Sequence, residues 1–375
     1  MNTTETLNAM TLARLSYYNL AMVRQLYDAA GSATAVIDNC NHLSDIVPGA
    51  SPRLAELLRD CGTMRARAEE EMNFCLAHGI SAIDLSSDSY PHRLAQCDDA
   101  PLVLYYKGTA DLNQRRVINI VGTRRSTAYG TDLIHSFIAD LTALCPHVLV
   151  VSGLAYGIDI CAHREALANG LETVGVLAHG LDDLYPNAHR ETARAMVSQG
   201  GLLTEFMTRT KAEKINFVRR NRIVAGMSDA CVLVESADHG GGLITADIAR
   251  SYDRDVFAFP GRVGDPYSAG CNNLIRDNGA QLLTSAETFV KAMGWEGDSQ
   301  LDKARQQGIE RHLFDDLTPT EQAVVSTLEA NNDLHLNMLA TQSNIPVNQL
   351  TAVLFELEMR GVVRTLAGGV YHLIK

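Results

Sequence analysis

Residues 117–130, VINIVGTRRSTAYG, place an apolar, β-branched run directly before a glycine turn, two arginines and the start of a helical stretch. This order is typical of the strand–turn–helix unit of a parallel sheet. Backbone N–H groups at the helix start and the guanidinium groups of Arg124 and Arg125 would converge on one place the size of an anion. The stretch therefore predicts an α/β fold and a phosphate-sized site within it.

The same rhythm continues along the chain. Further β-branched runs, each with a glycine-bearing turn and a helical stretch after it, occupy residues 147–152, 173–178, 201–206, 230–236 and 255–260, and residues 280–284 close the series. Alternating strands and helices predict an extended Rossmann-like, doubly wound parallel sheet, here assigned to residues 86–295. Ligands of such sheets bind beyond the carboxyl ends of the strands, so function is expected in the loops that follow them.

Three of these loops repeat the glycine-rich design. Residues 150–167, VVSGLAYGIDICAHREAL, contain Gly153 and Gly157, which allow close backbone approach, and Asp159 near the start of the next helix. Residues 176–186, VLAHGLDDLYP, end another strand beside the same crevice, and residues 235–249, ESADHGGGLITADIA, run three glycines into a helix that begins near Thr245. Glycines that only make tight turns would explain each loop equally well, so the loops alone do not decide the function.

A basic cluster adds weight to the anion hypothesis. Residues 209–222, RTKAEKINFVRRNR, hold six basic side chains against Glu213 alone, in a chain of 375 residues whose net charge is −12. The cluster occupies the N-terminal half of a predicted helix, where the helix dipole disfavours cations unless an anion is near. The alternative is a solvated basic face balanced by acidic residues elsewhere.

The two ends of the chain predict smaller domains. Residues 1–85 show apolar positions at helical spacing and predict a small helical, SAM-like domain, in which residues 46–58, IVPGASPRLAELL, weakly resemble a helix-hairpin-helix; a plain packing unit is the alternative. Residues 296–316 are polar and predict a linker. Residues 317–375 have the helix, helix-turn-helix and hairpin order of a winged helix.

Several functional classes lose support. No apolar run is long enough to span a bilayer and the N-terminus lacks the pattern of a signal peptide, so a cytoplasmic protein is expected. The eight cysteines are scattered without a C-x-x-C pair and are expected to be reduced thiols. Neither G-x-G-x-x-G nor a Walker A lysine is present, so no nucleotide cofactor is expected. Asp159 and His163 lack a third metal ligand, and no catalytic residue is predicted.

Eight segments, in this order and spacing, strongly resemble the DprA/Smf family of DNA-processing proteins over residues 85–285. They are YPHRLAQCDDAPLVLYYKG, INIVGTRR, VVSGLAYGIDICAHREAL, GLDDLYP, FVRRNRIVAG, LITADIA, FPG and GCNNLI. The resemblance implies a protein that binds and protects single-stranded DNA, works as a homodimer, and helps load a RecA-type recombinase during natural transformation or recombination.

The family's motifs fall on particular residues of this chain. The arginine of the G-[ST]-R loop corresponds to Arg124, and the lysine and aromatic of the F-x-x-R-N-R motif correspond to Lys214 and Phe217. Cations along a strand path and a flat ring for a base suit single-stranded DNA. The DNA-binding residues predicted in this way are Gly122, Thr123, Arg124, Arg125, Ser152, Gly153, Gly180, Lys214, Phe217, Arg220, Asn221, Arg222, Gly242 and Thr245.

Two departures from the family pattern stand in these motifs. Val218 and Arg219 replace the more usual proline-containing version of that turn, which adds charge. Residues 240–242 are Gly-Gly-Gly where Ser-Gly-Ser is common, which leaves Thr245 as a substitute hydroxyl.

Self-association is predicted through the end of the Rossmann-like domain. Leu274 and Ile275 lie on the helix around NNLIRDNG, and Leu282 lies on the final strand. Ordinary core packing of these side chains is the alternative.

Two other functions compete with DNA binding. GGGLITAD resembles the glycine loop of related nucleotide-processing enzymes, although Asp247 stands where those enzymes place a catalytic glutamate. A transcriptional regulator acting through the winged helix is the other alternative.

The charge of the winged helix generates a first prediction. Residues 317–375 hold three basic side chains, Arg360, Arg364 and Lys375, against five acidic ones, Glu321, Glu329, Asp333, Glu356 and Glu358. Reading a duplex groove requires phosphate neutralisation, which this balance opposes. A truncation ending near residue 300 should therefore keep most of the affinity for single-stranded DNA in a gel-shift titration. Loss of most of that affinity, in a truncation that circular dichroism shows to be folded, would contradict the prediction.

Overall fold

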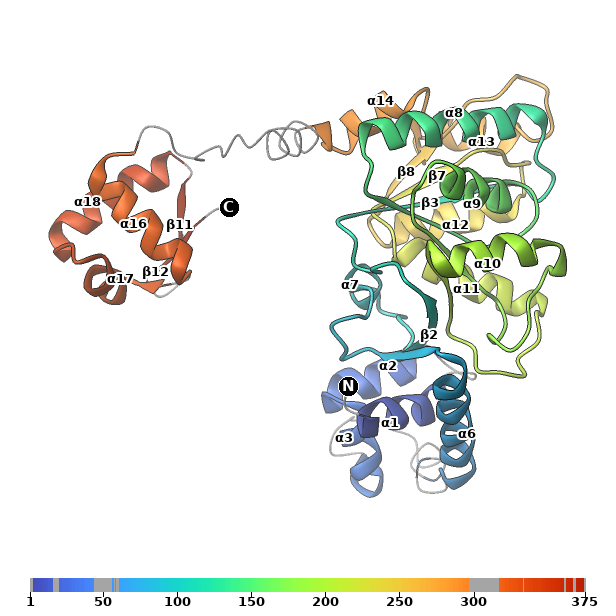
Figure 1. The fold of residues 1–375 in the computed structure, drawn as a ribbon, viewed down its shortest axis with the longest axis horizontal. Helices are drawn as coiled ribbons and strands as arrows, with labels where there is room; N and C mark the ends of the chain where they lie inside the picture. The colour runs from blue at the N-terminus through green and yellow to red at the C-terminus, as the bar shows by residue number, and fades with distance from the viewer. Residues whose placement is uncertain are drawn as a thin grey trace. The chain divides into compact units, whose positions relative to one another are not determined.

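The computed structural model describes residues 3–15, 20–43, 56, 58, 61–296, 317–332, 334–360, 362–366 and 369–373. The chain divides into two compact units, Met1–Gly297 and Asp298–Lys375 (Figure 1). The expected helix-hairpin-helix at 46–58, apart from Glu56 and Leu58, and the expected linker at 296–316, apart from Glu296, lie outside the described residues.

A nine-stranded sheet in the order β1-β2-β6-β5-β4-β3-β7-β8-β9 forms the centre of the first unit. Neighbouring strands from β6 across to β9 pair in parallel, which confirms the doubly wound parallel sheet. The seven expected strands are β3 (Arg116–Val121), β4 (Val148–Ser152), β5 (Thr173–Val176), β6 (Gly200–Thr204), β7 (Ala230–Leu233), β8 (Asp255–Ala258) and β9 (Gln281–Leu282).

Two strands were not expected. β1 (Ser81–Asp84) and β2 (Val103–Gly108) extend the sheet beyond β6, and both of their pairings are antiparallel. β1 falls inside the range that was expected to be entirely helical, so that expectation was wrong for residues 81–84. The strand has only four residues, which is too short for an alternating pattern to stand out, and its place is set by pairing with β2.

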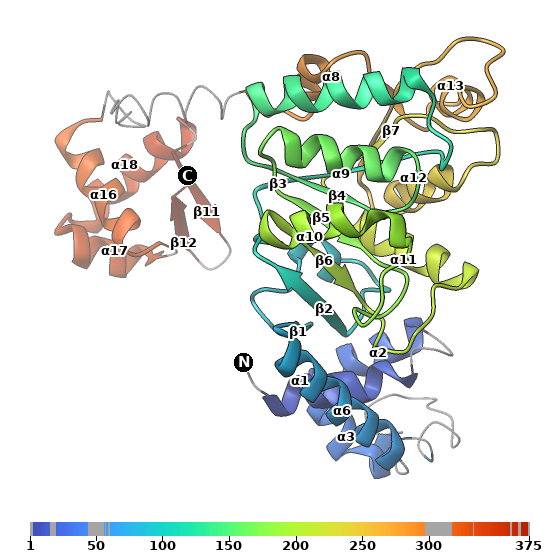
Figure 2. The ribbon, with the colours of Figure 1, turned by 45° about the vertical axis from the view of Figure 1, so that its right-hand side comes forward.

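Helices cover both faces of the sheet. Successive side chains of a strand point to opposite faces, so Ile118 and Ile120 pack in one core while Val117 and Val121 pack in the other. The first face carries α8 (Ala128–Leu144), α9 (Ile158–Ala168), α10 (Arg190–Ser198) and α14 (Ala286–Ala292), and Figure 2 shows α8, α9 and α10 in sequence along the sheet. The second face carries α7 (His92–Ala95), α11 (Lys214–Gly226), α12 (Gly241–Ser251) and α13 (Ala269–Arg276).

The N-terminal helices pack on the β1–β2 end of this unit. They are α1 (Thr3–Ala13), α2 (Leu20–Ala30), α3 (Ala33–Asp38) and α6 (Gly62–His78), with the 3₁₀ turn η2 (Cys40–His42). The buried carboxylate of Glu71 accepts hydrogen bonds from Thr208 N at 2.9 Å and from Arg67 Nη2 at 2.7 Å. This contact ties α6 to the segment after β6. A domain boundary near residue 85 remains a proposal, since the helices and the sheet share one compact unit.

The second unit contains α16 (Pro319–Ala330), α17 (Leu336–Ser343), α18 (Val347–Met359) and a three-stranded sheet in the order β10-β12-β11. Its strands are β10 (Leu334–His335), β11 (Val363–Leu366) and β12 (Val370–Leu373). Three helices followed by a β11–β12 hairpin have the arrangement expected of a winged helix. In the part of the chain that the structure describes, no helix is both long and apolar enough to cross a bilayer.

Candidate functional site

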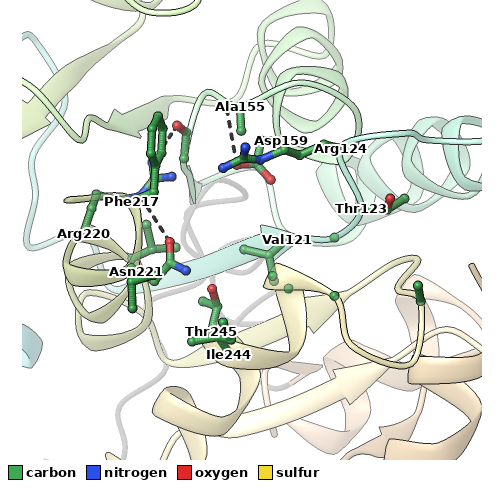
Figure 3. A pocket seen from close by; sticks show the side chains of 18 of the residues that line it. Val121, Thr123, Arg124, Ala155, Asp159, Phe217, Arg220, Asn221, Ile244 and Thr245 are labelled. Carbon is green, nitrogen blue, oxygen red and sulfur yellow. Dashed lines mark hydrogen bonds between the residues drawn. The ribbon is translucent and has the colours of Figure 1, made fainter. Parts of the chain in front are cut away.

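A cavity of about 510 Å³ lies at the carboxyl ends of β3, β4 and β7, where ligand binding is expected in such a sheet. The loop after β3 contributes residues 122–124, and the loop after β4 contributes Gly153 and Ala155. One face of α11, from Lys214 to Val224, and the glycine-rich start of α12 complete the wall (Figure 3). Segments far apart in sequence therefore meet at one pocket, as predicted for the loops after β3, β4 and β7, whereas the predicted loop at residues 176–186 is not part of the lining.

Two glycines make this close approach possible. A Cβ atom on Gly153 would lie 2.4 Å from Nη1 of Arg220, so only glycine lets that guanidinium lie against the loop after β4. Gly157 has φ +76°, and a Cβ there would lie 2.3 Å from the carbonyl oxygen of Thr123. The loops after β3 and β4 consequently touch through their backbones, and the pocket opens beside that contact.

Arg220 is buried beneath the pocket and joins the loop after β4 to the end of β5. Its Nη1 donates to the carbonyl oxygen of Gly153 at 2.6 Å and also to that of Val176. Burial lowers the pKa of Arg220 to about 10, with the carboxylate of Asp159 acting against that shift. The guanidinium therefore stays positively charged at neutral pH and gives the pocket floor a fixed charge.

The mouth of the pocket combines two exposed cations with an aromatic ring. Lys214 is exposed at the first position of α11, and Arg124 is exposed in the loop after β3. The guanidinium carbon of Arg124 lies 5.1 Å from the centroid of the half-buried Phe217 ring, within the range of a cation–π contact. An anion at this position would meet positive charge from Arg124, Lys214 and Arg220.

Asp159 is the acidic side chain in the pocket lining. It is buried, and its Oδ2 accepts a hydrogen bond from Ala155 N at 3.4 Å. Burial raises the pKa of Asp159, while the positive charge of Arg220 opposes the shift. The carboxylate offsets part of the charge of the arginines and is held on the pocket wall by the loop backbone.

Glu235 fixes the loop that carries Arg124. Its buried carboxylate accepts from Thr127 N at 2.9 Å and from Thr127 Oγ1 at 2.5 Å, and its carbonyl oxygen accepts from Thr123 N at 2.7 Å. The bonds brace both ends of the loop against the end of β7. Sequence reasoning missed this role, because nothing in the sequence marks an acidic residue as the partner of a loop more than a hundred positions away.

Most of the predicted DNA-binding residues meet at this pocket. Those that line it are Gly122, Thr123, Arg124, Gly153, Lys214, Phe217, Arg220, Asn221, Gly242 and Thr245. Whether these residues contact DNA stays a prediction.

The remaining four predicted residues, Arg125, Ser152, Gly180 and Arg222, are not part of the lining. Ser152 is buried and donates to the carbonyl oxygen of Ile120 at 2.6 Å. Arg222 is buried and paired with Glu205, two positions after Arg220 and therefore on the other side of α11.

Other lining residues were not among the predicted set. They are Val121, Ala155, Asp159, Val218, Val224, Ala237, Gly240, Gly241 and Ile244. Helical spacing from Lys214 could have found Val218 and Val224, because positions i+3, i+4, i+7 and i+10 share one face of a helix.

The predicted dimer residues lie away from the pocket. Leu274 and Ile275 are half-buried and pack against the core on the α11 face, as the core-packing alternative requires. Leu282 is 54% exposed on β9, the edge strand of the sheet. Only Leu282 therefore presents a large apolar surface for association.

The metal alternative finds no ligand set. Within the described residues, no group of three or more His, Cys, Asp or Glu side chains is placed to hold a metal ion. His163 is buried with its Nδ1 2.7 Å from Thr173 Oγ1, and burial lowers its pKa to about 3.

The enzyme alternative depends on Asp247, which stands at the position of the catalytic glutamate. Asp247 is exposed, its Oδ1 lies 3.8 Å from Nη1 of Arg250, and it is not part of the pocket lining.

Fold and pocket together define a Rossmann-like protein with a cavity, lined by basic side chains, at the carboxyl edge of its sheet. The sequence matches the family described as DNA recombination-mediator protein A over residues 81–294, and the DprA winged helix domain over residues 314–369. DNA processing protein DprA of Bacillus subtilis is 39% identical over 57% of this chain and 72% of its own length. The chain belongs to the DprA/Smf family.

Two solved structures resemble this one. DNA processing protein A from Streptococcus pneumoniae aligns with a TM-score of 0.64 and 30% identity, covering 75% of this chain and 95% of that one. The protein from Helicobacter pylori, whose structure addresses its single-stranded DNA binding mode, aligns with a TM-score of 0.52 and 26% identity over 57% of this chain and 95% of that one.

The raised pKa of Asp159 generates a prediction about stability. The folded protein binds the carboxyl proton more tightly than the unfolded chain, whose ordinary pKa is 3.8, so the ionised carboxylate lowers stability at higher pH. That penalty is absent below the unfolded pKa and complete above the folded one. Asp159→Asn should therefore be more stable than the parent protein at pH 7 in urea unfolding, and the gain should shrink as the pH falls toward 4.

The exposed Asp247 provides the control, and Asp247→Asn should show no such pH-dependent gain. If Asp159→Asn is less stable than the parent protein at pH 7, the attraction between Arg220 and the Asp159 carboxylate outweighs the cost of burying that carboxylate.

Proposed function

We propose that this protein binds single-stranded DNA in the pocket formed by the loops after β3, β4 and β7 and by α11. The observation that carries the proposal is the convergence of Arg124, Lys214 and Arg220 around the ring of Phe217. Cations that follow a sugar–phosphate backbone, together with an aromatic ring for bases, form the usual binding surface for single strands. The related protein from Helicobacter pylori, whose single-stranded DNA binding mode has been described, supports the proposal.

The pocket favours a single strand over a duplex. Phe217 is half-buried in the lining, so a base can use its ring only by leaving a base stack and entering the cavity. A base within a duplex has both faces covered by its neighbours, and extruding it costs a few kcal/mol. An unpaired strand supplies free base faces at a smaller cost.

The cellular role follows from the family. We place the protein in the cytoplasm, where it protects incoming single strands and helps load a RecA-type recombinase during natural transformation or recombination. The winged helix then serves as an accessory or protein-contact domain, because acidic side chains outnumber basic ones there. DNA binding is favoured over nucleotide processing, because Asp247, at the position of the enzymes' catalytic glutamate, does not line the pocket.

Removal of the two exposed cations tests the binding site. Lys214→Ala and Arg124→Ala should each weaken binding of a labelled single strand and reduce the log–log salt slope by about 0.7 per lost phosphate contact. Fluorescence anisotropy across a series of salt concentrations measures both quantities, with a duplex of equal length run in parallel. Lys291→Ala is the matched control, because Lys291 is exposed on α14 and is not part of the pocket lining.

An unchanged salt slope in both pocket variants would show that the strand binds elsewhere. Equal affinity for single strands and duplexes would overturn the preference for unpaired DNA.

We also propose that the protein is a homodimer that joins at β9. Among the described residues β9 is the last strand of the sheet and has no strand neighbour on its outer edge, and a cavity of about 470 Å³ lined by Leu282, Ile275 and Arg254 adjoins it. A twofold interface uses the same patch on both copies, and two DNA sites on one particle raise avidity.

Light scattering should show a dimer of the parent protein at micromolar concentration and a monomer for Leu282→Glu, because the new charge would lie in the apolar interface. Leu76→Glu, on an exposed leucine of α6, should stay dimeric. A monomeric parent protein would contradict the proposal.

A further inference from the structure

We propose that Tyr185 is a second base-binding ring, which receives the base next to the nucleotide held in the pocket. The inference rests on the proposed binding of single-stranded DNA and extends it to the GLDDLYP segment, whose role the pocket lining does not explain. The segment follows β5, and its tyrosine lies at the same carboxyl edge of the sheet as the pocket.

The ring of Tyr185 adjoins the pocket directly. It meets the ring of Phe217 edge to face, with the centroids 5.9 Å apart and the planes at 64°. Tyr185 is 49% exposed, so part of its ring is open to solvent. A nucleotide beside the one in the pocket would therefore meet an aromatic surface within one base step.

The contacts of Phe217 make this second ring necessary. Arg124 lies over the Phe217 ring at 5.1 Å, Arg220 lies at 6.0 Å, and Tyr185 contacts its side. A base that stacks on Phe217 must share the ring with these groups or displace Arg124. The exposed aromatic ring that contacts Phe217 belongs to Tyr185.

Hydrogen bonds hold the Tyr185 loop in place before any ligand arrives. Nδ1 of the buried His179 donates to the carbonyl oxygen of Gly180 at 2.8 Å, which leaves Nε2 free to accept from Tyr185 N at 3.1 Å. The neutral imidazole thus fixes the backbone at the tyrosine. A preset ring loses little conformational entropy when a base stacks on it, and that favours binding.

Nearby charges indicate how the strand would run. Arg124 and Lys214 attract phosphates on the pocket side, whereas the exposed Asp182 and Asp183 before Tyr185 line a separate cavity in which Lys107, Arg190 and Arg194 balance their charge. The phosphates would therefore follow the cations and the base would turn toward Tyr185. Since the two rings are inclined by 64°, bases lying flat on each of them cannot stack on one another. The strand must bend between the two nucleotides.

Substitutions at this one position separate stacking from other roles. Tyr185→Ala and Tyr185→Leu should raise the Kd for a single strand about 5- to 100-fold, because a stacked base is lost, whereas Tyr185→Phe should stay within about twofold. The salt slope should not change, since no phosphate contact is removed. Tyr129→Ala is the matched control, because Tyr129 is similarly exposed, at 47%, on α8 and is not part of the pocket lining.

An abasic scan of the shortest oligonucleotide that binds then locates the contact. In the parent protein, removing either of two adjacent bases should weaken binding. In Tyr185→Ala, removing one of these two bases should no longer change the affinity, while removing the other should still weaken binding. In Lys214→Ala, removing either base should still weaken binding.

The outcomes separate the two proposals. Salt-dependent binding that needs Lys214 but is unchanged in Tyr185→Ala would overturn the second ring and leave the pocket intact. If Tyr185→Leu binds the single strand as tightly as the parent protein, the residue acts only as an apolar spacer and the second ring is overturned. A parent protein that fails to bind single strands would overturn the proposed function and this inference with it.

Discussion

The buried guanidinium of Arg220 is the interaction on which the pocket depends. It binds the carbonyl oxygens of Gly153 and Val176, and so joins α11 to the ends of β4 and β5. A buried charge needs hydrogen bonds that offset its desolvation, and the loop carbonyls accept those bonds, while Asp159 adds an opposite charge nearby. The same arrangement places Phe217 and Lys214, on the preceding turns of α11, at the pocket mouth. The Arg220 side chain thus fixes the loop after β4 against α11, supplies the positive charge of the pocket floor, and helps to place the Phe217 ring.

Local charge, and not net charge, decides what this protein attracts. The chain carries a net charge of −12, yet the pocket gathers Arg124, Lys214 and Arg220 with Asp159 as the acidic member of the lining. Exposed charges farther away than about 8 to 10 Å are largely screened at physiological salt, so acidic surfaces elsewhere have little effect at the pocket. An acidic protein can therefore present a focused site for a polyanion and still avoid coating nucleic acid with its whole surface.

The parallel sheet could be predicted from the sequence because each strand–turn–helix unit is a local pattern. The β-branched runs, the glycine turns and the helix starts follow one another within about thirty residues, so their order predicted seven strands and the edge at which the site lies. Strands β1 and β2 could not be predicted in this way, because β1 is placed by antiparallel pairing with β2, and β2 by antiparallel pairing with β6. Nor did the sequence separate Arg220 from Arg222, since both stand in one basic run and only packing assigns one to the pocket and the other to Glu205.

By itself, the sequence determined the fold class, the family resemblance and most of the residues that line the pocket. It could do so because glycines, strand runs and cations occur at fixed spacings that depend on short-range backbone geometry. The tertiary structure decided which of those residues reach the cavity, that Asp159 joins them, that Glu235 braces the Arg124 loop, and that Tyr185 meets Phe217. These contacts join segments tens to more than a hundred residues apart, and their geometry exists only once the sheet has brought its carboxyl-end loops together.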